Sequence, residues 1–174
     1  KATDGYFYVY ATESTRNVPI MKSKDLVEWT YCNTAFTNKT RPRFEPKAGI
    51  WAPDINYING KYVLYYAMSV WGGEQTCGIG VATANSPQGP FTDHGKMFRS
   101  NEIGVQNSID PSLLQYEGRN YLVWGSFRGI YVIELTADGL SIMPGAKKKR
   151  IAGTAFEAVY IHKYGDYYYM FASI

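Results

Sequence analysis

Short runs of apolar and aromatic residues, separated by glycine and proline, make up most of the chain. The 174 residues include 17 glycines and 8 prolines, and no stretch of about 11 residues or more has the apolar spacing of a long helix. Tyrosine occurs 16 times and phenylalanine 8 times. Because aromatic side chains favour strands, the pattern predicts an all-β fold of many short strands.

One pattern occurs four times: a glycine turn followed by an aromatic-rich strand. The four copies cover residues 5–11, 60–67, 118–125 and 165–172. A second strand and a polar turn follow, and then an outer segment that carries Trp29, Phe91 or Ile142. A unit of about 50 residues with four short antiparallel strands is typical of a β-propeller blade. A β-sandwich is the alternative, but the period favours the propeller.

Three of the repeats carry an acid just before the aromatic hairpin: Asp54, Asp110 and Glu157. The innermost strand of each propeller blade lines the central channel, so we expect these acids to converge on one pocket. Carboxyls brought together push their pKa values apart, so one keeps its proton while another is ionised, as general acid–base catalysis on an acetal requires. Acids that only cap turns are the alternative. The spacing from Asp54 to its glycine differs from that of the other two acids. Asp54 can instead support the site from a second layer of residues, outside the pocket.

Several segments of the chain resemble glycoside hydrolase family 43, whose members are five-bladed propellers. The matching segments are Trp-Ala-Pro-Asp-Ile at 51–55, Asn-Ser-Ile-Asp-Pro at 107–111, Phe-Glu-Ala at 156–158 and the tyrosine-rich run at 167–173. Within the family, residues 19–29 and 124–130 are most similar to endo-arabinanases. Val159 departs from the pattern, because many relatives carry proline there.

The resemblance implies an inverting glycosidase with three essential carboxyls. Glu157 matches the general acid, and Asp110 matches the Asp that orients the site and tunes the acid. The third carboxyl, the general base, would lie upstream of Lys1. An inverting pair stands about 6.5–9.5 Å apart, as carboxyls from different blades would. Asp110 is expected to stay ionised and to keep the proton on Glu157.

Sugar rings also need flat apolar faces, and the glycine-rich loop at 69–73 offers Trp71. This loop resembles the aromatic loop of endo-arabinanases, so we expect Trp71 to stack on an arabinose ring, with packing on its own blade as the alternative. The other expected substrate-binding residues are Trp51, Asp54, Asn107 and Ser126.

The period makes residues 1–174 one incomplete domain. We expect blades at about 1–46, 47–104 and 105–152 and the start of another at about 153–174. Against the five blades of the family, this amounts to about three and a half blades, so the chain is expected to be truncated at both ends. Alone, it would be inactive on arabinan and prone to self-association.

Charge and composition limit the partners. The net charge of +3 is too small for nucleic acid, and no run of about 18 apolar residues suggests a membrane span. Cys32 and Cys77 leave the redox compartment and a disulfide open. The resemblance implies arabinan or arabinoxylan oligosaccharides as ligands, no cofactor or metal in this chain, and a central calcium-like ion in the complete enzyme. It also implies a secreted or periplasmic location, although no signal peptide is visible.

These observations together predict a glycosidase that cleaves α-1,5-linked L-arabinan. A β-xylosidase or α-L-arabinofuranosidase of the same family is one alternative. A carbohydrate-binding propeller without activity is another, and Glu157 with Asp110 argues against it, because a binding site has no use for a tuned acid.

Overall fold

The computed structural model describes all residues from 1 to 174 and contains thirteen strands in four antiparallel sheets. In chain order the sheets are β1 (Phe7–Tyr10), β2 (Pro19–Ser23) and β3 (Thr30–Thr34); β4 (Gly49–Ile58), β5 (Lys61–Ser69), β6 (Gly78–Ala84) and β7 (Thr92–Arg99); β8 (Ser112–Tyr116), β9 (Arg119–Trp124), β10 (Ile130–Glu134) and β11 (Lys149–Ala152); and β12 (Glu157–Tyr164) and β13 (Tyr167–Ser173). The one helix, α1 (Ser100–Ile103), follows β7. No helix here has the length and apolar character needed to cross a bilayer.

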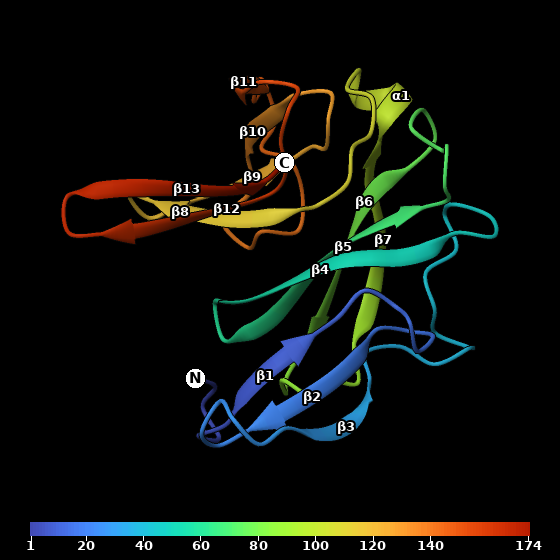
Figure 1. Cartoon of the computed structure of the whole chain (residues 1–174), viewed down its shortest axis with the longest axis vertical. Coiled ribbons are helices and arrows are strands. Elements are labelled where there is room, and N and C mark those ends of the chain that lie inside the picture. The colour runs from blue at the N-terminus through green and yellow to red at the C-terminus, as the bar shows by residue number, and fades with distance from the viewer.

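Each sheet is formed by one continuous stretch of chain, and the sheets follow one another in a fan (Figure 1). The predicted all-β architecture of successive blade-like sheets is therefore confirmed. In the outer segment of the third sheet, Ile142 makes an isolated bridge to Leu135, and the outer strand is β11. Both cysteines, Cys32 and Cys77, are free thiols.

The apolar core lies between the sheets, and β5 shows why. From Tyr62 to Ser69 every residue of β5 is buried, because successive side chains point to opposite faces of the sheet and both faces are covered. Tyr62, Leu64, Tyr66 and Met68 pack with residues of the first sheet. Val63 and Tyr65 pack with residues of the third sheet. The sheets therefore stack face to face, as blades do.

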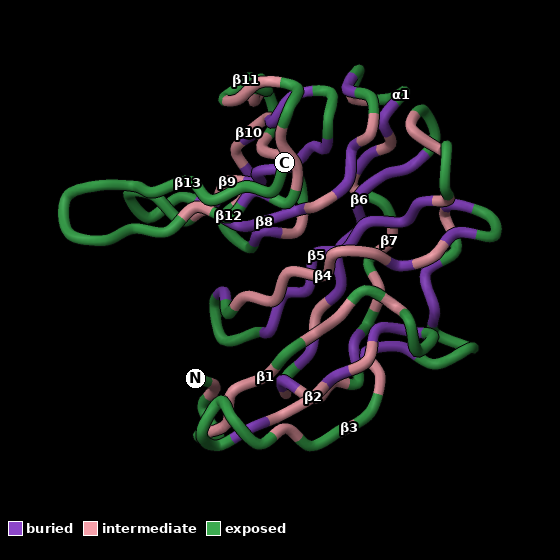
Figure 2. Tube along the Cα trace, viewed as in Figure 1, coloured by how far each residue is buried: buried purple, intermediate pink, exposed green.

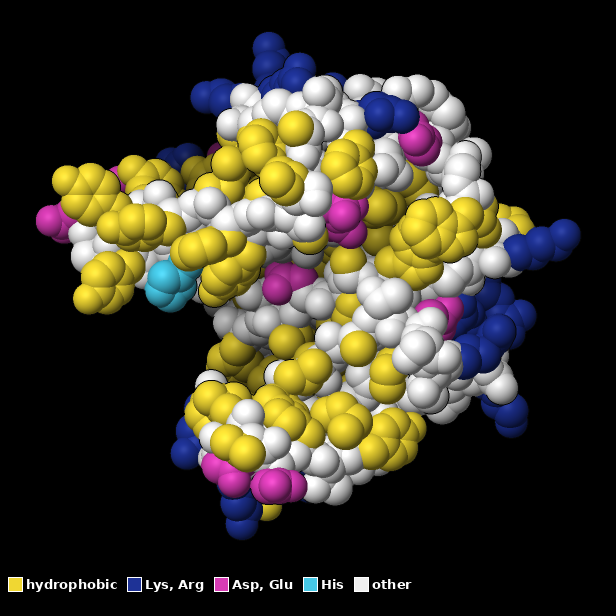
Figure 3. All heavy atoms as spheres, in the orientation of Figure 1, with side chains coloured by type: hydrophobic (Ala, Val, Ile, Leu, Met, Phe, Trp, Pro, Cys, Tyr) yellow, Lys and Arg dark blue, Asp and Glu magenta, His cyan; other side chains and the backbone are white.

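The hairpin of β12 and β13 has the same tyrosine-rich pattern but a different environment. Every residue of β13 is exposed (Figure 2). Apolar side chains also cover much of the hairpin surface in Figure 3. The hairpin packs on the third sheet through Val159 and Ile161 of β12 and through the ring of Tyr168, which meets Tyr116 of β8 edge to face. The strand pattern thus sets the conformation, whereas the neighbouring sheet decides burial.

A buried ion pair connects the first two sheets. Glu13, between β1 and β2, accepts two hydrogen bonds from Arg41, which lies between β3 and β4. The backbone N–H groups of Asn17 and Ile50 also donate to Glu13, at 2.7 and 2.8 Å. Burial opposes ionisation of Glu13, but these donors outweigh it and hold its pKa below the usual value.

Breaking this pair should destabilise the fold strongly. Glu13→Gln leaves the buried Arg41 charge without its partner and should cost about 3 kcal/mol of unfolding free energy at neutral pH. The loss should shrink as the pH falls through the lowered pKa of Glu13, because Glu13 then becomes neutral in the natural protein too. Urea denaturation at several pH values measures this.

Glu102→Gln is the matched control, because Glu102 pairs with Lys96 at an exposed position. Exposed pairs contribute little, so this variant should unfold at nearly the urea concentration of the natural protein. Equal destabilisation by the two substitutions would contradict the role given to Glu13.

Candidate active site

A pocket of 530 Å³ opens between the second, third and fourth sheets. It collects six of the seven residues predicted from the sequence: Trp51, Trp71, Asn107, Asp110, Ser126 and Glu157. The other lining residues are Thr12, Ala52, Ser69, Val70, Gly72, Gly73, Glu74, Ile109 and Phe127. Asp54, the seventh predicted residue, is not among them.

One backbone feature recurs at the pocket. Ala52, Asp110 and Ala158 all have a left-handed backbone, with φ of 44°, 56° and 50°. Each stands at the same point of its repeat, before Pro53, Pro111 and Val159. The ladders of β4 with β5 and of β12 with β13 shift register at this point. Non-glycine residues in this region are strained, and such strain gathers at functional sites.

The three predicted acids do not occupy equivalent positions around this left-handed residue. Asp110 is itself the left-handed residue, Glu157 precedes it and Asp54 lies two residues after it. The expectation that all three acids converge on one pocket is therefore wrong for Asp54. Two of them still meet, because a left-handed residue re-aims its own side chain and that of its neighbour.

Asp54 lies behind the pocket, between the second and third sheets. Its Oδ2 atom accepts a hydrogen bond from the Leu113 N–H at 2.8 Å and another from Asn56 at 2.7 Å. Burial raises the pKa of Asp54, against the effect of these two donors. Asp54 thus connects β4 to the start of β8, three residues after Asp110.

Glu157 and Asp110 are held by a short chain of polar contacts. The Ser126 hydroxyl donates to Glu157 Oε2 at 3.0 Å, and Asn107 donates to the Ser126 carbonyl at 2.9 Å. The backbone N–H of Ala158, beside Glu157, donates to Asp110 Oδ2 at 3.1 Å. The two carboxyls come from different sheets, and these contacts fix them as one unit.

Burial raises the pKa of Asp110 to about 6, and the charge of Glu157 adds to this, while the Ala158 N–H acts against it. Asp110 is therefore ionised at pH 7 but half protonated near pH 6, so the expectation that it simply stays ionised holds only at the higher pH. The negative charge of Glu157 thus makes ionisation of Asp110 less favourable.

The pocket has an aromatic side and an ionic rim. The rings of Trp71 and Trp51 lie 5.5 Å apart and tilted, and Trp71 is 93% exposed. Phe127 lines the wall from the next sheet. At the rim, Arg128 donates to both carboxylate oxygens of Glu74, at 2.9 and 3.0 Å. This pair connects the Trp71 loop to the loop that carries Ser126.

Sequence reasoning missed Thr12, Phe127, Glu74 and Arg128. Thr12 Oγ1 accepts a hydrogen bond from the left-handed Ala52 at 2.9 Å. The sequence could have identified Thr12, because Thr12 and Ser126 each follow an aromatic strand in the repeat. The Glu74–Arg128 pair has no such signal, since its members lie in loops of different length.

No three His, Cys, Asp or Glu side chains lie close enough together to hold an ion. A central calcium-like ion in the complete enzyme stays a prediction.

Comparison with known proteins agrees with the geometry. Residues 1–174 match the sequence profile described as glycosyl hydrolases family 43. The chain belongs to this family. Arabinan endo-1,5-alpha-L-arabinosidase A of Aspergillus niger is 31% identical over 99% of this chain and 55% of its own length. Extracellular endo-alpha-(1->5)-L-arabinanase 1 of Bacillus subtilis is 35% identical over 91% of this chain and 52% of its own.

The fold comparison gives the same family. The alpha-L-arabinanase of Cellvibrio cellulosa has a TM-score of 0.87 and 29% identity, covering 99% of this chain and 62% of that one. That protein has also been solved in complex with arabinohexaose. The family 43 chain described here spans about half the length of the curated relatives it matches.

The raised pKa of Asp110 makes stability depend on pH. The folded value of about 6 exceeds the unfolded value of 3.8, so ionisation of Asp110 destabilises the fold as the pH rises between them. Relative to Asp110→Asn, the natural protein should lose roughly 2–3 kcal/mol of unfolding free energy between about pH 4 and pH 7. Urea denaturation across this range measures it. A difference between the two proteins that does not change with pH would contradict the raised pKa.

Proposed function

We propose that the natural protein carrying this chain is an inverting glycosidase that hydrolyses α-1,5-linked L-arabinan. The observation that carries the proposal is the meeting of Glu157 and Asp110, from different sheets, in one open pocket with an aromatic side. The names of the relatives support arabinan as the substrate. An extracellular relative also supports secretion of the protein.

In this proposal Glu157 is the general acid. Its Oε2 is held by the Ser126 hydroxyl, and the carboxyl faces the pocket, where the glycosidic oxygen of a bound chain would lie. Glu157 gives its proton to that oxygen as the bond to the anomeric carbon breaks. Water attacks the opposite face of the sugar with the help of a general base. We assign that base to no residue of this chain.

Asp110 is a positioning residue in the same step. The Ala158 N–H fixes its carboxylate beside the backbone of Glu157. In the proposal, an ionised Asp110 carries the negative charge beside the acid that the family pattern requires. Asp54 acts further back, because its bond to Leu113 holds the start of β8 and hence the segment that carries Asp110.

Glu157→Gln tests the acid directly. Turnover of arabinan should fall by about 10²–10⁴-fold, the usual contribution of a general acid. Aryl arabinosides with good leaving groups should lose far less, because their departing oxygen needs no proton. Steady-state kinetics on both substrates, with the exposed Glu28→Gln as control, gives the comparison. Equal losses on the two substrates would contradict the assignment, and a natural protein that binds arabinan but cleaves nothing would favour a binding module.

Trp71→Ala tests the sugar-binding face. Because Trp71 is 93% exposed, its removal should barely change the melting temperature. It should weaken binding of arabino-oligosaccharides by about 1–3 kcal/mol, the value of covering a large apolar side chain. Tyr164→Ala removes another exposed aromatic residue, at the far end of the hairpin, and should leave binding intact. A Trp71 variant that melts early and binds normally would show that Trp71 only packs on its own sheet.

A further inference from the structure

A second pocket lies outside the candidate active site, where the loop between β3 and β4 meets the segment before β2. It has a volume of 450 Å³, and four of its nine lining residues are basic: Arg16, Arg41, Arg43 and Lys47. Glu45 is the one acid among them. Figure 3 shows Lys and Arg side chains gathered on the side of the molecule where these loops lie in Figure 1. The loops therefore form a concave basic surface.

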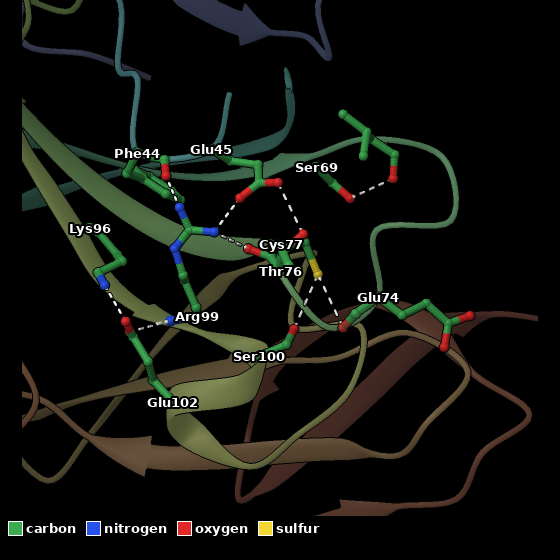
Figure 4. A network of polar contacts seen from close by, with 11 residues as sticks. Phe44, Glu45, Ser69, Glu74, Thr76, Cys77, Lys96, Arg99, Ser100 and Glu102 are labelled. Carbon is green, nitrogen blue, oxygen red and sulfur yellow. Dashed lines mark hydrogen bonds and ion pairs between the residues drawn. The ribbon is translucent and has the colours of Figure 1, made fainter. Parts of the chain in front are cut away.

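The acids near this pocket are already neutralised. Glu45 is bound by Arg99, which also donates to the carbonyls of Phe44 and Thr76, and by the Thr76 hydroxyl at 3.0 Å (Figure 4). Arg41 is paired with Glu13. The remaining cations, Arg16, Arg43 and Lys47, are exposed and form no ion pair. These three charges lack a counterion from the protein itself.

Two of these unpaired cations, Arg16 and Arg43, bind the same residue, Asn38. Arg16 Nε donates to the side-chain oxygen of Asn38 at 3.1 Å, and Arg43 Nη2 donates to the Asn38 carbonyl at 2.9 Å. A guanidinium carries five N–H donors, and Arg16 uses only this one, as does Arg43. Like charges held beside one residue repel unless an anion lies between them. The remaining donors suit the planar oxygen pair of a carboxylate.

The basic pocket adjoins the candidate active site along the chain. Ala48 and Met68 line the basic pocket, whereas Trp51 and Ser69 line the active-site pocket. Ala48 and Trp51 are three positions apart on extended chain, which is about 10 Å. A polysaccharide chain lying in the active-site pocket would therefore extend to the basic pocket within a few sugar units.

We propose that Arg16, Arg43 and Lys47 form a site for the carboxylates of an acidic, uronate-bearing polysaccharide, which would hold an acidic part of the substrate next to the neutral part being cleaved. This rests on the proposed function, because a carbohydrate in the adjoining pocket is what makes a sugar carboxylate the expected anion. The site takes no part in bond cleavage. Its contribution is to retention of the polymer on the enzyme.

Calorimetric titration with short oligogalacturonates at low salt tests the proposal in the natural protein. The double variant Arg16→Gln/Arg43→Gln should bind them about tenfold more weakly or worse, since each substitution removes a charge-assisted hydrogen bond. Lys147→Gln/Lys148→Gln, in an exposed basic run elsewhere, removes the same charge and should leave the affinity unchanged. Lys47→Gln repeats the test at a side chain that forms no bond to the loop, so weaker binding there cannot come from unfolding of the loop.

Three results would overturn the site: no binding by the natural protein, equal weakening in the two double variants, or equally tight binding of single-stranded DNA. Each would mean that the surface is only a solvated basic face. Cleavage of neutral linear arabinan is measured in parallel and should be the same in both double variants. If the natural protein does not cleave arabinan, the proposed function is overturned. The uronate titration measures binding alone, so its result tests the basic site without depending on cleavage.

Discussion

The left-handed residue near the start of each inner strand is the constraint on which the site depends. At Ala52, Asp110 and Ala158 the chain leaves regular strand geometry for one residue. A regular strand would alternate its side chains between the two faces of a packed sheet, where a carboxyl would bond to the next sheet, as Asp54 does to Leu113. The interruption instead turns Asp110 and Glu157 towards the shared pocket.

The strain of that geometry is held by the packing around it. Thr12 accepts the N–H of Ala52, and Asp110 accepts the N–H of Ala158. Behind them, β5 is covered on both faces, and the buried Glu13–Arg41 pair anchors Ile50, next to Trp51. The chemistry of the pocket and the stacking of the sheets are therefore connected through a few backbone groups. A change in the packing of one sheet therefore alters the geometry of the pocket that it forms with the neighbouring sheets.

Much of this arrangement could be predicted from the sequence. The glycine turns and aromatic runs determined the strands, and the family motifs identified six of the residues that line the pocket. The different spacing of Asp54 already indicated a supporting position, and its hydrogen bond to Leu113 agrees with this. The sequence could not show that burial raises the pKa of Asp110 to about 6. The exposure of β13 and the pairing of Glu74 with Arg128 also depend on neighbours that no local pattern specifies.

The central claim is that Asp110 and Glu157, brought together from two sheets, act as one unit. A double-mutant cycle on arabinan hydrolysis tests it most directly, with Asp110→Asn, Glu157→Gln and both together. Residues that act as a unit are far from additive, so the double variant should lose little more kcat/KM than the worse single variant. A double variant whose loss equals the product of the two single losses would show that the carboxyls act independently and would contradict the account.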